Sequence, residues 1–265
     1  WKVIRDLGVT QGSEPFSRLF NQGQILGPDG QRMSKSRGNV IAPDDQVARQ
    51  GADTFRCYLM FIGPWDEGGP FGIEGSAGIW RWLNRVWSLI LSEPNFGAAE
   101  PASTRNLRRL THQTVRKATE CLEGFHFNTL IAALMEMTNG LMRAREAGPV
   151  DRAAWDEATG GLLLMLAPLA PHIAEELWAR SGRPYSIHRQ AWPAWDAGLA
   201  RADEVTLVVQ VNGRLRDRIQ VSADIDEASA RELALTSPQV KKHIDNQEIK
   251  RVIYVPGKLV NVVVR

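Results

Sequence analysis

Apolar residues recur every three or four positions through the middle of the chain, and this spacing predicts a series of amphipathic α-helices. Between Asn128 and Glu146, for example, Ile131, Leu134 and Leu141 fall on one helical face. Short connectors separate successive stretches, so we expect neighbouring helices to pack antiparallel in a bundle. The helical stretches cover residues 79–90, 103–124, 128–146, 151–167 and 172–180, with Ser103 and Asp151 as the expected N-caps of two of them.

The first part of the chain has a less regular pattern. Residues 13–23 predict a short helix, which a serine and a proline open and a glycine ends. Residues 24–33 predict a small hairpin or extended loop around a Gly-Pro-Asp-Gly turn. A second helix is expected over residues 44–61, and the Gly- and Pro-rich segment 63–78 is expected to be a loop.

Alternating apolar residues replace the helical spacing near residue 200 and predict strands. Asn212 and Gly213 separate two strand-like runs, and this dipeptide favours the positive φ angles of a tight hairpin turn. Two short helical stretches and two more strand-like runs around Pro256-Gly257 complete this part. We therefore expect a mainly α protein with a small α/β domain at its C-terminal end.

Bulk properties exclude several classes of protein. The 265 residues carry a net charge of only +2, so any nucleic-acid binding must come from local basic patches. No apolar run reaches the roughly 18 residues of a membrane span. Cys57 and Cys121 form no CxxC pair, so neither a disulfide framework nor a zinc site is expected. Because no basic-then-apolar leader opens the chain, we expect a cytoplasmic protein, and an opening residue other than Met suggests a piece of a longer one.

One loop combines residues that are suited to phosphate chemistry. Met33, Ser34, Lys35 and Ser36 stand in a glycine-flanked segment without helical or strand periodicity. A lysine ammonium can follow moving phosphate oxygens, and the neighbouring hydroxyls and amides add hydrogen bonds. The alternative is an ordinary exposed basic turn, because serine, lysine and glycine are common in loops.

The order of these residues favours the first interpretation. RMSKSRGNVIAPDD, residues 32–45, resembles the KMSKS signature of class I aminoacyl-tRNA synthetases, and GADTFRCYLMF, residues 51–61, resembles the helix that follows it. The first position of the signature usually holds lysine, and this chain keeps the charge with arginine. The resemblance implies that Lys35 stabilises the pyrophosphate side of the adenylation transition state. The ATP-binding residues that it implies are Arg32, Met33, Ser34, Lys35 and Ser36.

Several further segments are similar, in order and spacing, to the C-terminal portion of bacterial-type leucyl-tRNA synthetases. They are EPFSRLFNQGQIL, FNTLIAALMEMTN, LAPLAPHIAEELW, VVQVNGRLRDRIQV and IYVPGKLVNVVV. The resemblance implies three parts. Residues 1–62 would end a catalytic domain and carry the KMSKS-like loop, residues 63–200 would form an anticodon-binding-type helix bundle, and residues 201–265 would form a tRNA-binding domain.

The implied activity is the ATP-dependent activation of leucine and its transfer to tRNA(Leu). The complete enzyme would use Mg²⁺ with ATP, but no metal site is expected within this chain, and a monomer is expected. Because a His-x-Gly-His segment, a complete nucleotide-binding half and an editing domain are missing, the chain alone should be inactive. The alternatives are a valyl, isoleucyl or methionyl enzyme, or a non-catalytic tRNA-binding protein of the same architecture.

Two sets of basic residues are candidates for contact with tRNA phosphates. In the helical stretch that starts at Ser103, three arginines and His112 recur at helical spacing and predict one basic stripe. In the terminal domain, three arginines alternate, so a regular strand would place them on one face. The alternative for both sets is a solvated surface. The candidates are Arg105, Arg109, Arg116, Arg214, Arg216, Arg218, Lys241, Lys242, Lys250 and Arg251.

Overall fold

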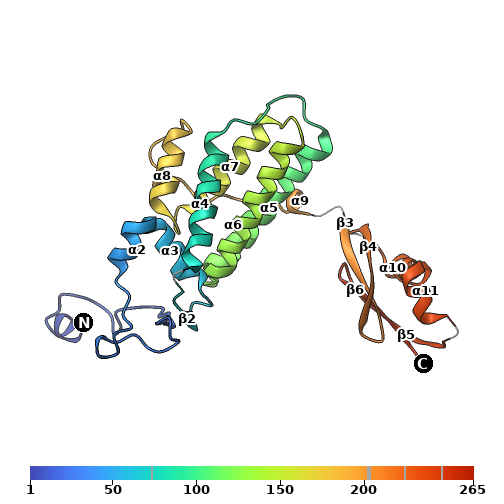
Figure 1. The fold of residues 1–265 in the computed structure, drawn as a ribbon, viewed down its shortest axis with the longest axis horizontal. Helices are drawn as coiled ribbons and strands as arrows, with labels where there is room; N and C mark the ends of the chain where they lie inside the picture. The colour runs from blue at the N-terminus through green and yellow to red at the C-terminus, as the bar shows by residue number, and fades with distance from the viewer. Residues whose placement is uncertain (73, 202–203, 224, 246) are drawn as a thin grey trace. The chain divides into compact units, whose positions relative to one another are not determined.

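The computed structural model describes residues 1–72, 74–201, 204–223, 225–245 and 247–265. The chain divides into two units, Trp1–Ala200 and Arg201–Arg265, each with its own hydrophobic core (Figure 1). Among the described residues, no helix combines the length and the apolarity that crossing a membrane requires.

The first unit is dominated by a bundle of long helices that run beside one another (Figure 1). The five helices expected in this region are present, and each buries its apolar face. The structure places their bounds at α4 (Gly75–Leu91), α5 (Pro101–Glu123), α6 (Phe127–Ala147), α7 (Arg152–Leu166) and α8 (Pro171–Arg180). A 3₁₀ turn, η2 (Ile187–Arg189), and a short helix, α9 (Ala197–Ala200), follow them.

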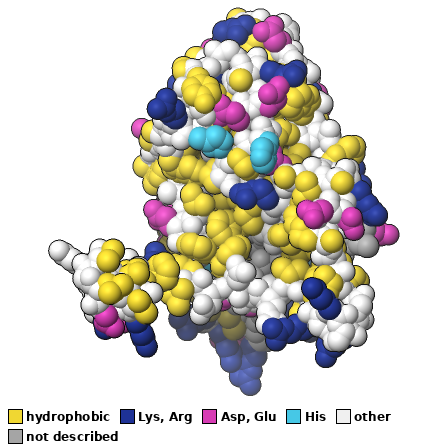
Figure 2. Space-filling model, turned by 90° about the vertical axis from the view of Figure 1, so that its left-hand side faces the viewer, with side chains coloured by type: hydrophobic (Ala, Val, Ile, Leu, Met, Phe, Trp, Pro, Cys, Tyr) yellow, Lys and Arg dark blue, Asp and Glu magenta, His cyan; other side chains and the backbone are white. Residues whose placement is uncertain are grey.

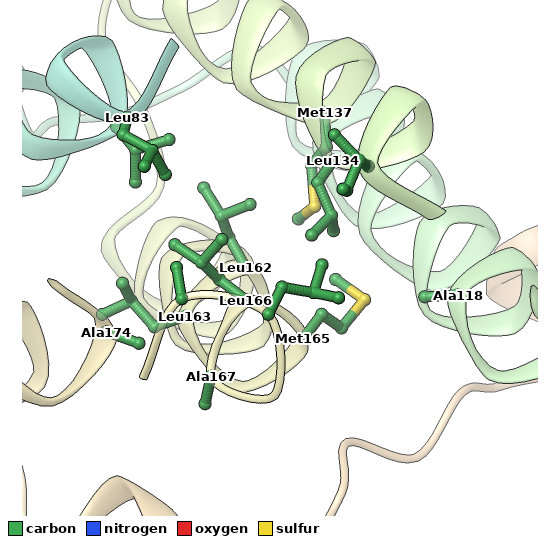
Figure 3. Close-up of a cluster of buried hydrophobic side chains, with 14 of the residues drawn as sticks. Leu83, Ala118, Leu134, Met137, Leu162, Leu163, Met165, Leu166, Ala167 and Ala174 are labelled. Atoms are coloured by element: carbon green, nitrogen blue, oxygen red, sulfur yellow. The ribbon is translucent and has the colours of Figure 1, made fainter. Parts of the chain in front are cut away.

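Leucine and methionine side chains from α4, α6 and α7 point toward one another in the bundle core (Figure 3). Leu134 and Met137 come from α6, and Leu162 and Leu166 come from α7; all four are fully buried. Removing such side chains from water supplies the main stabilisation of a bundle. The spacing of three and four that predicts these helices therefore also identifies their core.

The starts of α7 and α5 follow ordinary capping chemistry. The Asp151 side chain accepts a hydrogen bond from the backbone N–H of Ala154 at 2.9 Å, which confirms the expected N-cap of α7. The expected N-cap at Ser103 is wrong, because α5 begins two residues earlier, at Pro101. Proline is favoured at the first helical position, where the missing backbone N–H costs no hydrogen bond.

The residues before the bundle depart from several expectations. No helix forms over residues 13–23, where Phe16 and Leu19 remain exposed while Phe20 stacks on the Phe125 ring. A short helix with most of its apolar face uncovered is unstable in water. The expected helix over residues 44–61 is broken at Gly51, whose φ is 83°. The elements here are α1 (Lys2–Asp6), β1 (Gln24–Leu26), η1 (Lys35–Arg37), α2 (Pro43–Gln50), α3 (Ala52–Phe61) and β2 (Gly68–Pro70).

The expected hairpin over residues 24–33 is reduced to a single bridge between Leu26 and Arg32. Strand β1 pairs in parallel with β2. Strand β2 lies within the segment 63–78, which was expected to be a loop. Local sequence cannot reveal this pairing, because the two strands lie more than forty residues apart.

Helix α3 attaches the loop-bearing part to the bundle. Its Asp53 is buried, with one carboxylate oxygen 2.8 Å from His172 Nδ1 and the other accepting a hydrogen bond from the Ile173 backbone N–H at 2.7 Å. Arg56 donates to the carbonyl oxygens of Pro168 and Leu169 at 3.0 and 3.2 Å. Asp53 thus ties α3 to the start of α8, and Arg56 ties it to the turn before α8.

The second unit is a four-stranded sheet with the strand order β4-β3-β6-β5 and two helices. Strands β3 and β6 pair in parallel, and the two outer pairs are antiparallel. Asn212 and Gly213 adopt φ angles of 49° and 78°, which confirms the tight hairpin turn. The elements are β3 (Glu204–Val211), β4 (Arg214–Ser222), α10 (Glu227–Thr236), α11 (Pro238–Ile244), β5 (Ile249–Val255) and β6 (Leu259–Val264).

One buried polar contact offers a test of the bundle core. Trp82 Nε1 donates to Thr138 Oγ1 at 3.1 Å inside the bundle. Thr138→Val would leave the indole N–H buried without its acceptor, which typically costs about 1–3 kcal/mol. Urea denaturation should show this loss in the free energy of unfolding. Thr129→Val, at an exposed position of the same helix, should change it little; equal effects of the two variants would contradict the prediction.

Candidate functional site

A single 3₁₀ turn, η1, presents Lys35 to solvent. Ser34 precedes the turn in extended conformation, and Gly38 follows it at a φ of 67°, where a glycine avoids the steric cost of a side chain. The hydroxyls of Ser34 and Ser36 lie 2.9 Å apart, within hydrogen-bond distance. The turn therefore carries one exposed ammonium with two hydroxyls next to it in sequence.

Asp29 and Asn39 form a brace at the base of this loop. Asn39 Nδ2 donates to both carboxylate oxygens of Asp29, at 3.2 and 3.1 Å, and its Oδ1 accepts from the Ser34 backbone N–H at 2.9 Å. Hydrogen bonds from the Gln31 backbone N–H and then from Asn39 lower the pKa of Asp29. A Cβ at Gly27 would lie 2.7 Å from Asp29 Oδ1, so the brace requires a glycine there. Sequence analysis missed it, because aspartate and asparagine are common in turns for other reasons.

The five residues expected to bind ATP lie along this one loop but are not equivalent. Met33 is half-buried and packs against the core of the first unit, as does Ile41 at the far end of the loop. Arg32, Lys35 and Ser36 are exposed. The packing and the brace fix the two ends of the loop, while its cationic tip is left in solvent.

The expected basic stripe on α5 is interrupted at its centre. Arg105 and Arg116 are exposed, but His112 is only 7% exposed, and its Nε2 lies 3.1 Å from a carboxylate oxygen of Glu157 on α7. Its Nδ1 accepts a hydrogen bond from the Asp196 backbone N–H at 3.0 Å. His112 was therefore wrongly assigned to the stripe; it is a buried link between α5, α7 and the segment 190–200.

The segment 190–200 crosses this side of α5. Trp192 Nε1 donates to Thr119 Oγ1 at 2.8 Å, and the Arg116 guanidinium lies 5.6 Å from the centre of the Trp195 ring. Helical periodicity could not reveal this cover, because it comes from a segment some 75 residues further along the chain. The arginines of the stripe that remain at least partly accessible are Arg105, Arg109 and Arg116.

A β-bulge separates the alternating arginines of β4. Val211 pairs with Arg214, but the register then shifts, so that Arg216 has no direct partner in β3. Direct partners share a face of the sheet, which places Arg214 on the face of the buried Val211 and Arg218 on the opposite face, with Val208. The prediction that the three arginines share one face is wrong, because a bulge shifts the alternation by one residue.

The other basic candidates of the second unit lie on separate elements. Lys241 and Lys242 are exposed on α11, which packs against β3 and β4. Lys250 and Arg251 are exposed on β5, at the opposite edge of the sheet from β4. The basic candidates of this unit are thus divided among β4, α11 and β5 rather than joined in one continuous patch.

The described residues offer no group of three or more His, Cys, Asp or Glu side chains that could hold a metal ion. Cys57 and Cys121 are buried, and burial raises the pKa of the Cys57 thiol to about 12. A thiol in this environment stays protonated, so Cys57 packs as a small apolar residue rather than acting as a nucleophile.

Two families match this sequence. Residues 7–66 match the family described as tRNA synthetases class I (I, L, M and V), and residues 104–234 match the anticodon-binding domain of tRNA ligase. Over 99% of its length the chain is 54% identical to a leucine–tRNA ligase of Rubrobacter xylanophilus. The chain therefore matches bacterial leucine–tRNA ligases along its whole length. It is also 50% identical to the leucine–tRNA ligase of Dehalococcoides mccartyi and 42% identical to that of Deinococcus radiodurans, in each case over its whole length.

The chain spans about a third, 32%, of the length of each of these leucine–tRNA ligases. Among solved structures, it is similar over its whole length to 35% of a leucyl enzyme of Agrobacterium radiobacter K84, with a TM-score of 0.79 and 32% identity. That structure is a ternary complex with tRNA and LeuAMS. A methionyl-tRNA synthetase of Mycobacterium tuberculosis matches 62% of this chain with a TM-score of 0.50 and 15% identity, which indicates a shared fold alone; the match covers 38% of that enzyme.

The brace at the base of the loop can be tested by titration. Asn39→Ala removes the second of the two main causes that lower the pKa of Asp29, so this pKa should rise toward its ordinary value. The Ser34 amide should also exchange its hydrogen faster, because its acceptor is removed. NMR titration of the Asp29 carboxyl and hydrogen exchange of the loop would measure both effects. Gln31→Ala keeps the backbone N–H donor and should leave the pKa unchanged; a shift as large as that of Asn39→Ala would count against the brace.

Proposed function

We propose that this chain is the part of a leucine–tRNA ligase that supplies the mobile loop of the ATP site and surfaces that bind tRNA. The observation that carries the proposal is the 54% identity over nearly the whole chain, together with an exposed lysine on a loop fixed at both ends. The complete enzyme would join leucine to tRNA(Leu) at the expense of ATP. It would act as a monomer in the cytoplasm.

In the adenylation step, the leucine carboxylate attacks the α-phosphorus of ATP, and the bond from that phosphorus to the oxygen bridging to the β-phosphorus breaks. Pyrophosphate leaves with the bonding electrons and gains negative charge. The Lys35 ammonium is proposed to stabilise this charge, and the hydroxyls of Ser34 and Ser36 to bind phosphate oxygens. Mg²⁺ would accompany ATP in the complete enzyme.

Binding of tRNA is proposed to use both units. The accessible arginines of α5 are at helical spacing along one side of the bundle, as contacts with a row of backbone phosphates require. In the second unit, Arg214 follows directly on the Asn212-Gly213 turn, at the exposed end of the hairpin. Cations at such positions neutralise phosphates and contribute affinity without reading the sequence.

The role of Lys35 predicts a loss of adenylation. In the protein completed by the missing two thirds of a leucine–tRNA ligase, Lys35→Ala should reduce leucine-dependent ATP–pyrophosphate exchange by about 10²–10³-fold, because one charge-stabilising group is removed. Arg37→Ala removes another exposed cation of the same turn and should have a much smaller effect. Undiminished exchange by Lys35→Ala would refute the assignment, and equal losses would point to the charge of the loop as a whole. The 265-residue chain alone should show no exchange above background.

The role of the terminal hairpin predicts a salt-dependent weakening of tRNA binding. Arg214→Ala combined with Arg216→Ala should weaken binding of a tRNA(Leu) transcript and lower the slope of log affinity against log salt by about one for each phosphate that is no longer neutralised. Filter binding at several salt concentrations would measure both quantities. Arg231→Ala removes a cation that is engaged by the Val252 carbonyl and Glu227, and it should leave the slope unchanged. The assignment fails if the double variant and this control behave alike.

A further inference from the structure

A groove of about 420 Å³ lies between α4 and the starts of α3 and α8, outside the loop and the basic sets described above. The side of the molecule on which α2 and α8 lie is shown in Figure 2, where hydrophobic side chains gather between charged ones. Among the groove's lining residues are Trp80 and Trp87 from α4, Gln50 from the end of α2, and His172 from α8. Neither the loop chemistry nor the basic stripe uses these residues.

The α4 wall of the groove carries two indole rings. Trp80 and Trp87 are seven residues apart, which places them on the same face of the helix, and Trp80 is 46% exposed. Trp82, on the other side of the same helix, is fully buried. Burying a tryptophan is strongly favourable, so a half-exposed ring at the mouth of a groove marks a surface that a ligand can cover.

Polar groups line the rest of the groove without giving it a strong charge. The Asp53 carboxylate is engaged by His172 Nδ1 and the Ile173 N–H, so its charge is largely satisfied. The His172 side chain is 75% exposed. Because its Nδ1 is engaged by Asp53, Nε2 is the ring nitrogen that it can offer to a ligand. The Gln50 amide adds a donor and an acceptor, and so does that of Asn84, whose Nδ2 also donates to the Trp80 carbonyl at 2.8 Å. These groups together suit a flat ring with hydrogen-bonding edges.

We propose that this groove binds an unpaired nucleobase of RNA. The base would stack on Trp80, while the amides and His172 Nε2 bond its edge, which is how proteins bind unstacked bases. The Arg81 side chain, next to Trp80 in sequence and exposed, is available to the adjoining phosphate. The occupant is assigned as RNA because the chain is similar over its whole length to an enzyme solved with tRNA, so the inference rests on the proposed tRNA binding.

The test uses the 265-residue chain with fluorescein-labelled single-stranded RNA hexamers, hexauridylate and hexaadenylate, measured by fluorescence anisotropy. Trp80→Ala should weaken hexamer binding by about tenfold, the effect typical of losing one base-stacking ring. Trp80→Phe should restore most of the affinity, because a phenyl ring still stacks. Leu91→Ala is the matched control: it lies on the same helix with similar exposure, 39%, but does not line the groove, and it should bind as the unaltered chain does. Thermal melts of each variant establish that it is folded.

A second measurement locates the base. RNA that contains 4-thiouridine should photo-crosslink to the peptide that carries Trp80, and adenosine monophosphate at high concentration should reduce this crosslink. Three results would each overturn the proposal: equal affinities of Trp80→Ala and Leu91→Ala, no binding of the hexamers, or crosslinks confined to other peptides. A groove that is covered in the completed enzyme would overturn it as well. Leucylation and the salt dependence of tRNA binding are measured separately, so failure here leaves the proposed function standing.

Discussion

The buried carboxylate of Asp53 is the interaction on which the arrangement of the first unit depends. Burying a charge is costly unless hydrogen bonds or an opposite charge compensate for it. Asp53 meets this requirement at the start of α8, through His172 and the Ile173 N–H, and Arg56 adds two bonds to the preceding turn. Helix α3 is thereby held in one position against the bundle, because any other position would leave the carboxylate without partners. The loop that precedes α2 and α3 inherits this fixed position.

A fixed base and a free tip are what a loop requires if it acts on a reacting phosphate. Met33 and Ile41 pack against the same core to which α3 belongs, and the Asp29–Asn39 brace closes the loop at its base. Between these anchors, a single 3₁₀ turn holds Lys35 out in solvent. A charge placed in this way can approach developing negative charge without reorganisation of the bundle, which is the condition under which electrostatic stabilisation is most effective.

The extent to which the sequence predicts this structure depends on how local each feature is. The bundle helices, the Asp151 cap and the Asn212-Gly213 turn are encoded within a few residues, and they are present as expected. The features that sequence analysis missed depend on contacts between distant segments. Phe16 and Leu19 remain exposed where a helix was expected, β1 pairs with a strand more than forty residues away, and the segment 190–200 buries His112. For the candidate site, motif order predicts a role for Lys35, which stays a prediction, and periodicity could reveal neither the Asp29–Asn39 brace nor the bulge at Arg216.

The distribution of charge bears on how such a chain would hold a large polyanion. A net charge of +2 provides little long-range attraction, so affinity has to come from small sets of cations on separate elements. The interrupted stripe on α5 and the divided sets of the second unit would each bind weakly alone. Covalent connection makes the second contact intramolecular once the first has formed, which raises the overall affinity without any strongly basic surface. If tRNA contacts both units as proposed, a shaped RNA that reaches both sets would be favoured over nucleic acids that reach only one.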